Sequence, residues 1–140
     1  MKKIIPSFLI LICLVGCTSY KFDRTKFDTI MSDNFSHMLE ISDDELKSSY
    51  KLDLTKFNEH VFKVSYEEPV DVYIALKYNN KKEAKKEIEK FIQILETKYD
   101  KDNQNRINKG EFTTIDNYLI YIVGDKNDEI IKEIKEKMTK

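Results

Sequence analysis

The sequence lacks cysteine over nearly its whole length, because its two cysteines, Cys13 and Cys17, both lie near the start. The rest of the chain cannot form a disulfide bond, so its stability must come from packing alone. Charge of one sign is also missing, since 24 basic residues nearly balance 25 acidic residues. Nucleic-acid binding usually requires a strongly basic surface, and this composition gives no support for it.

Recognisable catalytic motifs are missing as well. The chain contains no Gly-x-Ser-x-Gly pattern and no His-Glu-x-x-His pattern. We expect His37 and His60 to be solvent-facing or capping residues, with a general-base role as the alternative. The pair Glu67 and Glu68 precedes Pro69 in an expected hairpin turn, where side chains are usually solvated. We therefore predict that the protein is not an enzyme, the alternative being an envelope hydrolase without a recognisable motif.

The one long apolar run lies near the N-terminus. Lys2 and Lys3 precede apolar residues 8–15, which is the pattern of an export signal. The run is too short to be a membrane anchor, because a spanning helix needs about 20 apolar residues. The sequence therefore predicts an exported protein without a permanent transmembrane helix.

The tetrapeptide Leu14-Val15-Gly16-Cys17 ends this leader and resembles the lipobox of bacterial lipoproteins. The resemblance implies that a diacylglyceryl group is attached to the sulfur of Cys17 and that residues 1–16 are removed as a signal peptide. Residues 17–23 then form the lipidated N-terminus and a short tether, and residues 24–140 form one domain. The mature chain has 22 basic and 25 acidic residues, a net charge of −3. We place it on the outer face of the bacterial cytoplasmic membrane.

Apolar residues recur at helical spacing in several segments of the domain. Ser42 and Glu45 form a capping box, in which each side chain satisfies a free backbone donor, and thereby mark one helix start. Asn79-Asn80 opens the longest pattern, which runs to Tyr99. The predicted helices are 24–38, about 43–50, about 80–99 and about 127–138, and residues 100–109 are expected to be a polar loop.

Strand patterns fall between these helices. Residues 62–66 and 70–77 alternate in polarity and predict a hairpin, and residues 111–115 and 118–123 predict a second one. Both faces of 118–123 are apolar, as expected of a central strand, whereas 70–77 alternates as if only one face were buried. The fold class is therefore α+β. We expect a two-layer sandwich of a largely antiparallel four-stranded sheet, packed by the long and C-terminal helices and preceded by N-terminal helices.

The order of these elements carries a family resemblance. Residues 24–138 resemble the bacterial lipoproteins of the domain-of-unknown-function family numbered 4358. The segments that carry it are Ser42 to Leu46, Tyr50 to Asp53, Val70 to Leu76, Ala84 to Leu95 and Asn117 to Val123. The resemblance implies an exported, lipid-anchored α+β domain, and it implies no activity and no functional residues.

One segment, from residue 100 to residue 111, resembles an EF-hand or dockerin-type calcium loop. Asn105 stands where such loops have glycine, and residues 112–123 have the chemistry of a hairpin instead of the helix that an EF-hand requires. We therefore expect a polar helix-to-strand loop without metal, and calcium binding is the alternative. The candidate ligands are Asp100, Asp102, Gln104, the carbonyl of Arg106, and Glu111.

Two groups of side chains are candidates for binding surfaces. Lysines at 81, 82, 85 and 86 could touch anionic lipid headgroups, although interspersed glutamates favour a solvated helix face. Tyrosines at 66, 73, 118 and 121 could line an exposed sheet face, although packing in the core or its rim is the commoner role.

Together these features favour a non-enzymatic, membrane-anchored binding or accessory module. We expect it to recruit a protein, peptide or small ligand through the face or the edge of its sheet. Calcium is the one cofactor that the sequence suggests, and a calcium-stabilised domain is a further alternative.

Overall fold

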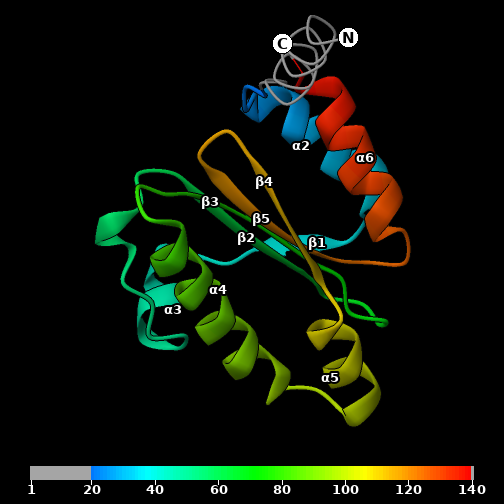
Figure 1. The fold of residues 1–140 in the computed structure, drawn as a ribbon. Coiled ribbons are helices and arrows are strands. Elements are labelled where there is room, and N and C mark those ends of the chain that lie inside the picture. The colour runs from blue at the N-terminus through cyan, green and yellow to red at the C-terminus, as the bar shows by residue number, and fades with distance from the viewer. Residues whose placement is uncertain (1–19, 140) are drawn as a thin grey trace, which may run out of the picture.

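The computed structural model describes residues 20–139, and a five-stranded antiparallel sheet lies at the centre of the molecule (Figure 1). The strand order is β1-β2-β3-β5-β4, and every neighbouring pair is antiparallel. Both predicted hairpins are confirmed. The strands are β1 (Met38–Glu40), β2 (His60–Ser65), β3 (Val72–Lys77), β4 (Glu111–Ile115) and β5 (Tyr118–Val123).

Helices cover both faces of this sheet. On one face lie α2 (Arg24–Asn34) and α6 (Asn127–Lys137), and the other face carries α3 (Asp43–Ser48), α4 (Lys81–Glu96) and α5 (Lys101–Asn108) (Figure 1). The predicted α+β class is confirmed. The two-layer arrangement is wrong, because α4 and α6 pack on opposite faces and make three layers with two separate cores.

The two central strands are buried on both sides as a result. All six residues of β5 are buried, as predicted, and the first five residues of β3 are buried too. The alternation expected for β3 is therefore wrong. Tyr73 and Ala75 lie on the face of β3 that was expected to be open. They face α2 and α6 and belong to the second core.

Local signals in the sequence place the starts of the four predicted helices correctly to within one residue. The Ser42 hydroxyl accepts a hydrogen bond from the backbone N–H of Glu45, and the side chain of Asn80 caps α4. Helix α2 ends four residues earlier than predicted, because Met38 starts the short edge strand β1. The four-stranded sheet predicted from the sequence consequently has a fifth strand.

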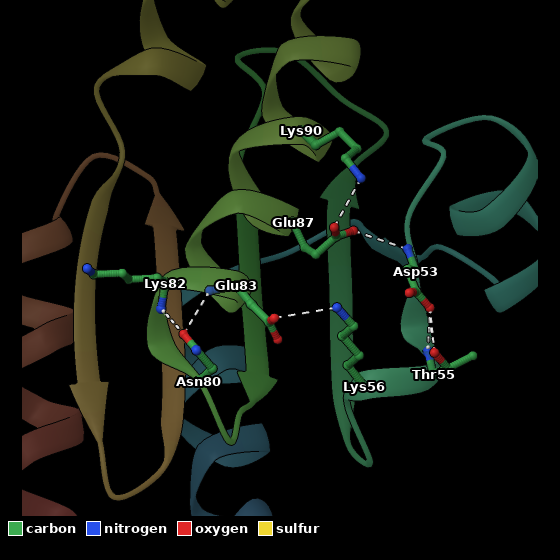
Figure 2. A network of polar contacts seen from close by, with 8 residues as sticks. All are labelled: Asp53, Thr55, Lys56, Asn80, Lys82, Glu83, Glu87 and Lys90. Carbon is green, nitrogen blue, oxygen red and sulfur yellow. Dashed lines mark hydrogen bonds and ion pairs between the residues drawn. The ribbon is translucent and has the colours of Figure 1, made fainter.

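A polar network fastens the loop before β2 to α4 (Figure 2). The Glu87 carboxylate accepts hydrogen bonds from the backbone N–H of Asp53 at 3.1 Å and from Lys90 Nζ at 3.0 Å. Lys56 lies 3.4 Å from Glu83. Hydrogen bonds from the hydroxyl and the backbone N–H of Thr55 lower the pKa of Asp53. Each of these side chains is paired within the network, so we assign the network a structural role.

Candidate functional site at the open edge of the sheet

Because helices cover both faces of the sheet, only its two edge strands remain open to a partner strand. Natural edge strands are usually protected by short length, charged residues, proline or bulges. Strand β1 has three residues, and one of them is Glu40. Strand β4 has five residues, and residues 112–115 contain neither charge nor proline. Its pairing with β5 runs without a bulge, so β4 is the unprotected edge.

A groove of about 230 Å³ lies beside this edge, between β4 and α4. Phe112 is 36% exposed and leans against Tyr121, with 4.7 Å between the ring centroids. Lys85 Nζ lies 5.5 Å from the centre of the Phe112 ring. The full lining is Glu89, Ile92, Gln93, Asn108, Gly110, Phe112 and Tyr121. The groove thus combines an apolar floor with polar groups at its rim.

The floor of this groove depends on a close approach between Gly110 and Tyr121. A Cβ at residue 110 would lie 2.3 Å from the Tyr121 ring, so only glycine fits. The Tyr121 hydroxyl donates a hydrogen bond to the carbonyl of Ile107 at 2.6 Å. Burial raises the pKa of Tyr121 to about 12, so this hydroxyl keeps its proton at physiological pH. The Tyr121 ring is therefore held in one position in the groove.

Carboxylates gather at the start of β4. The pKa of Glu111 is raised, chiefly by a hydrogen bond with the carboxyl group of Asp128 and then by burial. Asp125 and Glu129 line the same cleft of about 280 Å³ as this pair. One end of the open edge is therefore acidic, whereas residues 112–115 are uncharged.

The candidate calcium ligands do not come together. Residues 101–108 form α5, so the expected loop conformation is wrong. Asp100 caps this helix, the Gln104 side chain donates to the carbonyl of Tyr99, and Glu111 lies in β4. Asp102 lines a polar cleft with Arg106. Among residues 20–139, no group of three or more His, Cys, Asp or Glu side chains could hold a metal ion.

Arg106 has a role that the sequence did not indicate. Its guanidinium donates to Asp71 at 2.5 Å, to Asp125 at 2.7 Å and to the carbonyl of Val70 at 2.8 Å. It therefore joins α5 to the start of β3 and to the connection between β5 and α6. The sequence offers one hint of this role, namely that arginine is rare in the chain, which has only two.

The histidines and tyrosines occupy scattered positions. His37 Nδ1 lies 3.0 Å from the Tyr66 hydroxyl, and its Nε2 lies 3.7 Å from Glu67. His60 Nε2 lies 2.7 Å from Asp43 in the first turn of α3. Tyrosines 73, 118 and 121 are buried, as the preferred packing role predicts, and only Tyr66 of the four is exposed, so they do not line an open sheet face. Lysines 81, 82, 85 and 86 are exposed, in agreement with a solvated helix face.

Comparisons with protein families, with curated proteins and with solved structures returned no match for this chain. None of the helices between residues 20 and 139 is both long and apolar enough to cross a membrane. The functional argument therefore starts from the geometry of the β4 edge.

Proposed function

We propose that this protein is a lipid-anchored, non-enzymatic binding module that captures an extended polypeptide segment along β4. The observation that carries the proposal is the unprotected β4 edge beside the Phe112 groove. An added strand gains affinity from main-chain hydrogen bonds and specificity from pockets that receive alternate side chains. The β4 edge offers both features.

The groove and the acidic cluster define the segment that would bind best. An apolar side chain would enter the groove between Ile92 and Phe112. A basic side chain near Glu111 and Asp128 would relieve the repulsion between their carboxylates. The preferred ligand is therefore an extended peptide with an apolar residue and a basic residue.

The anchor belongs to the same proposal. Lipidation at Cys17 would confine the module to the membrane surface, where a tethered binder meets other surface components at a raised effective concentration. Mass spectrometry of the native polypeptide tests this part. We expect loss of residues 1–16 and a diacylglyceryl group on Cys17, whereas an intact, unmodified leader would contradict the anchor.

Selection from a library of displayed random peptides tests the edge. We expect purified lipoprotein to enrich peptides with alternating apolar residues. Phe112→Lys should weaken the binding of selected peptides by about tenfold or more, because it removes the apolar contact and places a charge on the edge. Leu39→Lys is the matched control, since Leu39 is 58% exposed on the opposite edge strand. Equal binding by both variants, or no enrichment, would refute capture along β4.

The Glu111–Asp128 pair favours an envelope hydrolase as the second candidate. Two carboxyl groups that share a proton can divide the roles of acid and base. Asp128 is exposed, however, and an open site weakens the burial effects on which such pairs rely. If Asp128→Asn abolished hydrolysis of cell-wall fragments by the purified protein, this candidate would replace the binding module.

A further inference from the structure

The described chain begins fastened to the C-terminal end of the domain. The backbone N–H of Lys21 donates to the carbonyl of Met138 at 3.0 Å, and Tyr20 forms an isolated β-bridge with Thr139. The two ends of the described segment, Tyr20 and Thr139, thus lie together beside α2 and α6, and α5 lies at the opposite end of the molecule (Figure 1). We call the surface around residues 20–27 and 134–139 the tether end.

Only a short span of chain separates this end from Cys17. Three peptide units connect Cys17 to Tyr20, and they extend to no more than about 11 Å. Lipid attached to Cys17, as in the proposed function on which this inference rests, would hold the tether end next to the headgroups.

Charge is distributed to match that position. The tether end has five basic and two acidic residues, a net charge of +3. The segments 66–71 and 124–129, which both contact Arg106 of α5, have net charges of −3 and −2. The mature chain has a net charge of −3, so the tether end is more basic than the chain as a whole.

An apolar groove lies between these cations. Thr25, Lys26, Thr29, Ile30 and Lys137 line a space of about 290 Å³ between α2 and α6. Lys26 Nζ donates to the carbonyl of Lys137 at 3.3 Å, so the two lysines are neighbours. Lys137 is paired with Glu133, and Arg24 with Asp28. Within residues 20–139, neither Lys21 nor Lys26 has a carboxylate within 4.0 Å.

We propose that the tether end binds anionic phospholipid headgroups through Lys21, Lys26 and Lys137. Basic side chains beside a lipid anchor are attracted by the negative surface potential of a membrane over about a Debye length, roughly 10 Å at 0.1 M salt. The contact fixes the orientation of the domain, so that α5 points away from the membrane.

The test uses the lipidated protein in phosphatidylcholine vesicles with or without phosphatidylglycerol. The mature chain has no free thiol when Cys17 is lipidated, so Thr25→Cys and Asn105→Cys each place one fluorophore, at the tether end and on α5. A quencher attached to lipid headgroups reports proximity. We expect the Thr25 fluorophore to be quenched about two- to threefold more strongly in the anionic vesicles. That difference should vanish near 1 M salt, where the Debye length is about 3 Å, and the Asn105 fluorophore should remain unquenched throughout.

Charge variants provide the control. The double variant Lys26→Gln/Lys137→Gln should lose the difference between the two vesicles, whereas Lys101→Gln/Lys109→Gln, which removes two lysines of the distal end, should keep it. Equal quenching in both vesicles, insensitive to salt, would overturn the headgroup contact. Flotation with vesicles at high salt distinguishes a failure of the lipid anchor from a failure of the headgroup contact. A protein without its anchor would not float at all, whereas an anchored protein without the headgroup contact would still float.

Discussion

Gly110 is the residue on which the candidate groove most depends. Tyr121 cannot move aside for a larger residue, because it is buried and its hydroxyl is bonded to Ile107. We expect Gly110→Ala to lower the free energy of unfolding by about 1 to 3 kcal/mol, as overpacking commonly does. Gly124→Ala should cost less, since its nearest contact would be at 3.0 Å. Urea unfolding checks both, and equal losses would contradict the close-approach argument.

Arg106 makes three hydrogen bonds that no other residue type could reproduce at once. We expect Arg106→Gln to destabilise the fold by about 2 kcal/mol, because Asp71 and the carbonyl of Val70 would lose a partner. The control is the other arginine: Arg24 is exposed and paired with Asp28, so Arg24→Gln should cost under about 0.5 kcal/mol. Thermal unfolding of both variants distinguishes them. Similar losses would mean that the Arg106 network contributes no more than a surface pair.

The carboxyl pair of Glu111 and Asp128 predicts a pH dependence. The pKa of Glu111 is raised above 4.5 in the folded state, so the pair stabilises the fold below that pH. This contribution is lost as the pH rises through the folded-state pKa. We expect Asp128→Asn to raise the urea concentration at the midpoint of unfolding at neutral pH, because it removes the repulsion between the two carboxylates. In acid the midpoint should change little. Glu129→Gln removes the same charge from the same helical turn, so identical profiles for the two variants would contradict the pairing.

At the scale of elements, α5 is held by polar contacts. Asn103 is buried, and its side-chain oxygen accepts a hydrogen bond from the backbone N–H of Val70 at 3.1 Å. Asn103→Ala should cost about 1 to 3 kcal/mol, because it leaves that donor unpaired. Hydrogen exchange at Val70 should speed up in this variant, and it should stay unchanged in Asn105→Ala, which alters an exposed position of the same helix. Unchanged exchange in both would contradict this docking role.

These contacts explain which elements could be predicted from the sequence. Helix α4 and strands β4 and β5 carry their own signals, namely an asparagine cap, helical spacing and β-branched or aromatic runs. Helix α5 buries only Asn103 and Ile107, so it has almost no apolar pattern. Strand β1 has three residues, and its Met38 also continues the helical spacing of α2. Tertiary contacts decide both of these elements.

The candidate site was predicted only in part, because edge status depends on strand order. Residues 111–115 were predicted to be a strand. Their place at the edge follows from the strand order, in which β5 lies between β3 and β4, and the sequence does not give that order. The sequence predicted binding through either the face or the edge of the sheet. Because helices cover both faces, the proposed binding site is at the edge. The resemblance to the family numbered 4358 stays a prediction, as do the lipid anchor and the alternative of calcium binding.

For the whole molecule, the proposals assign different tasks to different regions. In these proposals the tether end would face the membrane, and β4, at the edge of the sheet, would remain open for a polypeptide. Stability is independent of this division, because two apolar cores on opposite faces of the sheet hold the layers together without a disulfide.

Hydrogen exchange along β4 with a selected peptide bound tests the central claim most directly. An added strand would pair with the outward N–H groups of residues 112–115, so their exchange should slow by about tenfold or more. The amides of β1 should not change. Unaltered exchange in β4, or protection confined to the polar cleft between α5 and α6, would contradict capture along the open edge.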